Sequence, residues 1–150
     1  MAQKFALERV REIADHQTDA AAARLAGLNR ELHEQESRLM VLFRYREEYR
    51  ERLQKSAAGG LDAAAMRNYH EFMQRLEHAI MQQHAMVVEA RTRAEHGRLD
   101  WQNHRRKSMA FDSLSQRHAV RVMREDARRD QKNQDEFAQR HVQHGAKPAR

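Results

Sequence analysis

The fold is decided by residues 66–125, MRNYHEFMQRLEHAIMQQHAMVVEARTRAEHGRLDWQNHRRKSMAFDSLSQRHAVRVMRE. Mostly apolar or small side chains recur there at alternating steps of three and four residues, which places them on one face of a helix. The positions are Met66, Tyr69, Met73, Leu76, Ile80, Gln83, Val87, Ala90, Ala94, Gly97, Trp101, His104, Ser108, Phe111, Ser115, His118, Val122 and Glu125. A seven-residue repeat sustained this far is typical of a coiled-coil seam and leaves little room for a catalytic pocket.

A second helix is predicted over residues 4–55. Its seam positions are Leu7, Val10, Ala14, Gln17, Ala21, Leu25, Leu28, Leu32, Gln35, Leu39, Leu42, Arg46, Tyr49 and Leu53. Two steps of four follow each other around Ala21 and Leu25, which predicts a local slip in the supercoil.

The two helices are separated by residues 56–62, SAAGGLD. Gly59 or Gly60 can end a helix in the left-handed conformation, and Asp62 can cap the next helix, which is predicted over residues 63–137. So short a link predicts an all-α fold in which the two helices form an antiparallel coiled-coil hairpin. The whole chain, 1–150, is expected to be one coiled-coil domain with a flexible tail over residues 138–150.

A hairpin centred on Gly59 predicts a register in which facing residues have numbers that sum to roughly 118. Tyr49 then faces Tyr69, and Leu42 faces Leu76. Small residues are expected to meet in the middle, with residues 20–23, 26 and 27 opposite Ala90, Ala94 and Gly97. This register leaves residues 114–137 without a partner helix.

Charge is distributed unevenly along the 150 residues. Residues 1–100 hold 16 Lys or Arg and 16 Asp or Glu, whereas residues 101–150 hold 12 and 6, so the last third carries the whole net charge of +6. A basic segment indicates an acidic partner, which can be a protein, a nucleic acid or a lipid headgroup.

Several classes of site find no support. Cysteine is absent, so disulfides and thiolate chemistry are excluded. His33-Glu34 and His70-Glu71 lack the second histidine of a zinc-protease motif, because Ser37 and Gln74 stand in its place. No nucleotide-binding or nucleophile motif, membrane-spanning run or secretion signal is found, so we expect neither enzyme activity, nor a cofactor, nor a metal site.

Two surfaces are candidates for binding. Five of the nine aromatic residues are near the predicted turn, where Tyr45 and Phe72 each stand one position off the seam. They either widen the core or form an apolar patch for a partner. The basic segment is either a solvated face, a nucleic-acid arm or a helix that inserts into a protein ring or groove.

Three segments resemble the FliJ family, the soluble component of the bacterial flagellar type III export apparatus. They are LMVLFRYREEYRERL (39–53), NYHEFMQRLEHAI (68–80) and RDQKNQDEFAQR (129–140). The resemblance implies an antiparallel two-helix coiled coil similar to the gamma-subunit stalk of rotary ATPases. It also implies a cytoplasmic protein, peripheral to the inner face of the cell membrane at the flagellar base. Its expected partners are the hexameric export ATPase, whose ring assembly it promotes, the cytoplasmic domain of the FlhA export gate, and export chaperones that it cycles.

The resemblance also implies two sets of binding residues. The gate set consists of Leu42, Tyr45, Tyr49, Phe72, Leu76 and Ala79. Beside it, Arg38 and Gln83 stand where the family pattern has Gln and His. The set expected at the ATPase ring combines the basic segment with both helix-terminal regions: Phe5, Leu7, Arg11, Arg117, Arg121, Arg124, Arg128 and Phe137. Nucleic acid is not an expected partner of such a protein; the alternative function is a basic rod that binds nucleic acid or an anionic membrane surface.

Overall fold

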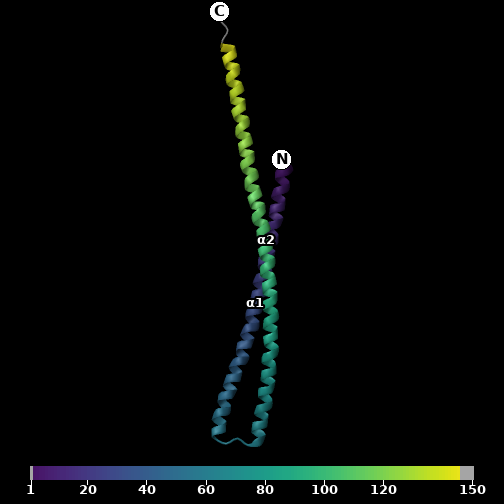
Figure 1. The fold of residues 1–150 in the computed structure, drawn as a ribbon, viewed down its shortest axis with the longest axis vertical. Helices are drawn as coiled ribbons and strands as arrows, with labels where there is room; N and C mark the ends of the chain where they lie inside the picture. The colour runs from purple at the N-terminus through teal and green to yellow at the C-terminus, as the bar shows by residue number, and fades with distance from the viewer. Residues whose placement is uncertain (1, 146–150) are drawn as a thin grey trace, which may run out of the picture. The chain divides into compact units, whose positions relative to one another are not determined.

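The computed structural model contains two long helices, α1 (Ala2–Ala58) and α2 (Ala63–Gly145), packed in antiparallel (Figure 1). It describes the backbone of residues 2–145 and the side chains of residues 6–145. The predicted all-α hairpin is therefore confirmed. The helices exceed the predicted bounds: α1 begins at Ala2 and ends at Ala58, and α2 continues through residues 138–145, which were expected to be a flexible tail.

The turn follows the predicted chemistry. The Gly60 φ of 82° lies in the left-handed region that glycine adopts without strain, and the Gly59 and Gly60 amides donate to the carbonyls of Ser56 and Ala57. Asp62 caps the start of α2, since its Oδ1 accepts a hydrogen bond of 2.7 Å from the Ala65 amide. That contact satisfies one of the amide donors that a helix N-terminus leaves free.

The chain divides into two units. The hairpin unit is His16–Arg105 and contains the turn, and the terminal unit combines Met1–Asp15 with Arg106–Arg150. The core of the hairpin unit is a thin seam, and its buried apolar residues all stand at predicted seam positions: Ala21, Leu76, Ile80, Val87, Ala90 and Ala94. Gln35 is buried among them, and Gln83 donates hydrogen bonds to its side-chain oxygen at 2.7 Å and to its carbonyl at 3.0 Å.

The register agrees with the prediction at two pairs of residues and departs from it by about one helical turn at Gly97. A Cβ built on Gly97 would lie 3.9 Å from the Cα of Leu25, so these two backbones face each other and their numbers sum to 122. The pairs Tyr49–Tyr69 and Gln35–Gln83 do make contact and sum to 118. In both pairs a long side chain of α2 reaches a backbone carbonyl of α1, that of Tyr49 or of Gln35.

The slip predicted at Ala21 and Leu25 is wrong. Val10 and Gln17, which were assigned to the seam, are exposed, while Arg11 and Thr18 are partly buried. The inward residues of this stretch therefore keep alternating steps of three and four without a break: Leu7, Arg11, Ala14, Thr18, Ala21, Leu25 and Leu28. The middle of the hairpin also differs from the prediction that small residues face each other. Gly97 packs against Leu25 and Leu28, whereas a Cβ on Gly27 would meet only Arg30 of its own helix.

In the terminal unit residues 7–15 of α1 pack on α2. Ala14 and Ser108 are buried, the Ser108 hydroxyl donates to Asp15, and Arg11 Nε lies 2.7 Å from Asp112 Oδ1. Leu7 and Glu8 line a hollow together with residues of α2 as far as Met123. Residues 114–123 thus have a neighbour, contrary to the prediction, and every described residue from Ala119 to Gly145 is exposed.

Candidate docking surfaces

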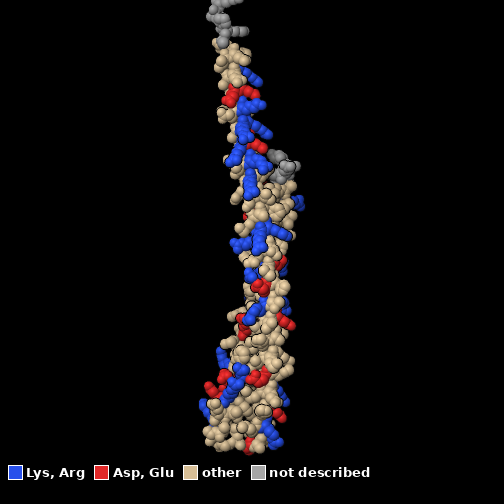
Figure 2. Space-filling view, in the orientation of Figure 1, with Lys and Arg blue, Asp and Glu red and all other residues tan. Residues whose placement is uncertain are grey.

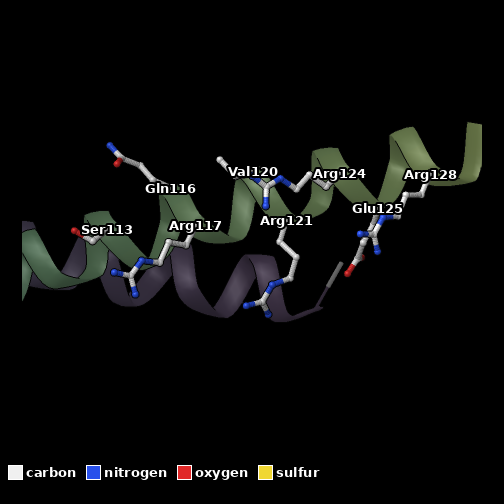
Figure 3. Close-up of a pocket in the computed structure, with 8 residues that line it drawn as sticks. All are labelled: Ser113, Gln116, Arg117, Val120, Arg121, Arg124, Glu125 and Arg128. Carbon is white, nitrogen blue, oxygen red and sulfur yellow. The ribbon is translucent and has the colours of Figure 1, made fainter.

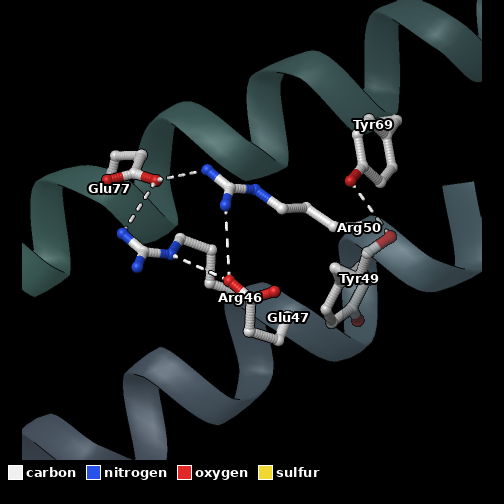
Figure 4. Close-up of polar contacts among 6 residues, drawn as sticks. All are labelled: Arg46, Glu47, Tyr49, Arg50, Tyr69 and Glu77. Atoms are coloured by element: carbon white, nitrogen blue, oxygen red, sulfur yellow. Dashed lines mark hydrogen bonds and ion pairs between the residues drawn. The ribbon is translucent and has the colours of Figure 1, made fainter.

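The two flanks of the seam in the hairpin unit carry different chemistry. One flank is closed by ion pairs. Near the turn, Arg46 and Arg50 lie 3.6 and 4.0 Å from Glu77 (Figure 4). Further along the hairpin, Arg91 lies 3.4 Å from Glu36. We call this side the charged flank. Arginine and carboxylate side chains placed across a seam shield its apolar residues from water.

The opposite flank changes character along its length. Far from the turn it is closed by Glu31–Arg93 at 2.7 Å and Arg24–Asp100 at 3.1 Å. Counting in sevens from Arg93 toward the turn leads to Met86, Ala79 and Phe72, and counting from Glu31 leads to Arg38 and Tyr45. Apart from Arg38, apolar and aromatic residues therefore replace the ion pairs, and we call this stretch the open flank.

Side chains of the open flank are accessible. Tyr45, Phe72 and Met86 are 49%, 37% and 44% exposed. Leu42 lines a groove with five residues of α2, which are Ala79, Gln82, Gln83, Ala85 and Met86. An apolar groove with exposed aromatic side chains beside it is typical of a protein-binding site.

The structure brings most of the predicted gate set together. Tyr49 and Phe72 are in ring contact, with centroids 4.2 Å apart and planes tilted by 31°, and Leu42 and Ala79 share the groove. Tyr69 donates a hydrogen bond of 3.0 Å to the Tyr49 carbonyl, which joins the two helices beside the Tyr49–Phe72 ring contact (Figure 4). Leu76 is buried, so it supports the surface and is not itself accessible.

Sequence reasoning missed Gln82 and Met86 as part of this surface. The signal was present in the spacing, because Phe72, Ala79 and Met86 are separated by seven residues each and so share a face. Met86 also lines the groove with Leu42 and Ala79. The open flank is therefore longer than the predicted set.

The residues predicted for the ATPase ring fall into separate groups. Leu7 lines the hollow of about 210 Å³ with Ser115, His118 and Val122 of α2. Arg11 is already paired with Asp112. Phe137 is 65% exposed, and its ring lies 4.9 Å from that of His141. The side chain of Phe5 lies outside the described residues.

The remaining four form an arginine ladder, Arg117, Arg121, Arg124 and Arg128. They line one shallow groove on α2 with Ser113, Gln116, Val120 and Glu125 (Figure 3). Figure 2 shows Lys and Arg side chains gathering on the visible face of this part of α2. Steps of four, three and four residues place the ladder on one face of the helix.

Charge pairing elsewhere is mostly local and exposed. Arg98 donates to Glu95 on the same helix, and this hydrogen bond lowers the pKa of the Glu95 carboxyl and raises the pKa of Arg98. Among residues 2–145, no group of three or more His, Asp or Glu side chains is placed to hold a metal ion. Over the same residues neither helix has a stretch apolar and long enough to cross a bilayer.

Comparison with known proteins gives one consistent family. The family model described as flagellar FliJ protein matches residues 3–147. The flagellar FliJ protein of Salmonella typhi is 31% identical over 140 residues, which covers 93% of this chain and 95% of the relative. The flagellar FliJ protein of Escherichia coli (strain K12) is 29% identical with the same coverage. These matches span both candidate docking surfaces.

Proposed function

Because this chain belongs to the FliJ family of flagellar proteins, we propose that it serves flagellar protein export as a non-enzymatic adaptor. It binds the hexameric export ATPase and promotes assembly and activity of its ring. It also engages the cytoplasmic domain of the FlhA export gate and cycles export chaperones. It works in the cytoplasm, peripheral to the inner face of the cell membrane at the flagellar base.

The open flank carries this proposal. A self-sufficient two-helix seam would be closed by charges on both flanks, as the charged flank is by Glu77 and Glu36. On the open flank, exposed Tyr45 and Phe72 and the groove beside Leu42 offer aromatic and apolar contacts that a partner can cover. We assign this surface to the export gate.

The terminal unit is assigned to the ATPase ring. Its hollow beside Leu7, the arginine ladder and Phe137 are exposed features on a helix that continues past its packing with α1. A helix without a partner along its length can be surrounded by a ring or laid in a groove. Arg11 is less available to the ring than the sequence suggests, because its guanidinium group already pairs with Asp112.

Gate binding is tested by truncating the exposed aromatics. Tyr45→Ala and Phe72→Ala are expected to weaken binding to the FlhA cytoplasmic domain at least tenfold, the equivalent of about 1.4 kcal/mol, as for aromatic residues at the centre of an interface. Val41→Ala and Val88→Ala are matched controls, since both valines are exposed at 42% and 47% outside the open flank. Equal affinities for all four variants, measured by titration calorimetry, would contradict the assignment.

ATPase binding is tested by hydrolysis rates and by a truncation. The full chain is expected to raise the rate of ATP hydrolysis by the export ATPase and to increase the fraction of hexamer on a sizing column. Truncation after Ser113 removes the ladder and the α2 side of the hollow, so it should abolish both effects and spare gate binding. If the full chain neither raises the rate nor co-migrates, the ATPase is not its partner.

A further inference from the structure

Several arginines of the hairpin unit pair with the opposite helix, and those of the ladder do not. Arg24, Arg46, Arg91 and Arg93 each lie within 4.0 Å of a carboxylate on the opposite helix. In the part of the chain that the structure describes, no ladder arginine has a carboxylate at that distance, although Glu125 stands among them. Four guanidinium groups on one helical face are thus available to a partner.

The heptad positions of the ladder arginines indicate what kind of partner they bind. Arg121 and Arg128 stand 28 and 35 residues after Arg93, in the same heptad position, and Arg93 pairs with Glu31 of a neighbouring helix at 2.7 Å. Arg117 and Arg124 lie beside them on the same face. The ladder repeats the arrangement that elsewhere in this chain receives the carboxylates of an adjacent helix.

The geometry is that of one line of charge. Arg117 and Arg128 are separated by 11 residues, or roughly 16 Å along the helix axis. Figure 3 shows the side chains on successive turns, with the guanidinium groups of Arg117 and Arg121 extending to the same side of α2. A second helix with carboxylates at the same steps of three and four residues presents a line of equal length.

The surroundings disfavour a nucleic acid. Residues 113–140 hold seven Lys or Arg and five Asp or Glu, so a phosphate backbone would meet carboxylates close to the ladder. Phe137 is the one aromatic residue among residues 113–145, so successive bases would have no stacking platform. A protein helix of mixed charge can pair with Glu125 as well as with the arginines.

We propose that the arginine ladder is a docking site for an acidic α-helix of a partner protein, whose carboxylates repeat at helical spacing and pair with Arg117, Arg121, Arg124 and Arg128. The inference rests on the proposed function in one respect: there, the acidic helix belongs to the export ATPase. The recognition chemistry itself is independent of that identity.

The first experiment uses the full chain and a synthetic helical peptide with glutamates at the four matching positions. A peptide with glutamine in their place is the control. Fluorescence anisotropy should show binding of the glutamate peptide only, weakening between roughly 50 and 300 mM NaCl because exposed charge pairs are screened. The variant R117Q/R121Q/R124Q/R128Q should lose roughly tenfold to a hundredfold in affinity, and Arg→Lys at the same positions should lose less.

Glutamine keeps the helix propensity of arginine, so circular dichroism of the variant should be unchanged. A matched variant, R30Q/R75Q, removes two exposed arginines of the hairpin unit and should bind the peptide like the wild type. Unchanged binding by the ladder variant would overturn the proposal. So would tighter, ladder-dependent binding of a single-stranded oligonucleotide or of anionic phosphatidylserine vesicles.

The same proteins are then assayed with the export ATPase. Loss of both ATPase and peptide binding in the ladder variant supports the proposal in full. If the wild type binds the peptide through the ladder but does not bind the ATPase, the ladder still binds acidic helices. In that case the proposed function is wrong, and this inference stands. If the ladder variant binds the ATPase as tightly as the wild type does, the acidic helix is not in the ATPase.

Discussion

Gly97 and Gly27 are both in helix interiors, but only one of them is needed as glycine. A Cβ on Gly97 would lie 2.6 Å from Leu28 Cδ1, whereas a Cβ on Gly27 would have nothing nearer than 3.9 Å. Alanine stabilises an open helix site by about 0.5–1 kcal/mol. Gly27→Ala should therefore raise the free energy of unfolding by about that amount, and Gly97→Ala should lose the gain to crowding against Leu28.

Urea unfolding followed by circular dichroism measures the difference. Gly97→Ala is expected to be less stable than Gly27→Ala by about 1 kcal/mol or more. Equal stabilisation by both substitutions would mean that the helices do not approach closely at Gly97.

The buried pair Gln35 and Gln83 makes a second prediction at this scale. Gln83→Leu removes the donor from the side-chain oxygen of Gln35, which is only 8% exposed, so it should destabilise the chain by about 1–2 kcal/mol. Replacing both residues by leucine leaves no orphaned group and should restore or exceed the wild-type stability. A double-mutant cycle in urea tests this, and additive losses in the double variant would contradict it.

Among the elements, the start of α2 depends on one side chain. Asp62 Oδ1 accepts from the Ala65 amide at 2.7 Å, and Asp62→Ala should lower stability by about 1 kcal/mol because that amide loses its partner. Asp62→Ser keeps an acceptor and should retain most of the stability. Thermal unfolding of the three proteins would distinguish this cap from a purely solvated aspartate, for which both substitutions would be neutral.

The elements themselves were predictable because their signals are local. The 3-4 spacing, the Gly59-Gly60 break and Asp62 determine two helices and a turn without reference to the rest of the chain. The register was not predictable to better than a turn, since it depends on the turn conformation and on how side chains pack across the seam. Nor was the inward position of Arg11 and Thr18, where the continuous heptad frame outweighs the hydrophobicity of Val10.

The candidate sites likewise include features that the sequence predicts and features that only the structure shows. Tyr45 and Phe72 could be placed on a flank from their spacing alone, but only the structure decides that both are exposed and do not merely widen the core. Whether an arginine is paired or free depends on which helix lies opposite, so Arg11 could not be separated from the ladder without the structure. The identity of a partner is not encoded in periodicity at all.

At the scale of the whole molecule, the two units should differ in local stability. The hairpin unit buries seam residues of both helices, whereas all described residues from Ala119 to Gly145 are exposed. A single helix without tertiary packing is marginal in water. Amides of residues 124–145 should therefore exchange with deuterium much faster than those of residues 76–94, which mass spectrometry of peptic fragments can resolve.

Binding of the acidic peptide or of the ATPase should slow exchange in residues 117–128 first. Uniform protection along α2 in the free protein would instead mean that a second chain covers the terminal unit. Sedimentation of the same sample would show that assembly.

The unbroken frame of the seam has a consequence for how the length of such a chain can vary. One extra residue in either helix would rotate everything beyond it by about 100° and turn Leu25 or Ala90 toward water. Within the paired region, insertions and deletions are therefore tolerated in whole heptads, added to both helices at once. The stretch after Met123 is free of this rule, so natural variation in length should accumulate there and at the Gly59-Gly60 turn.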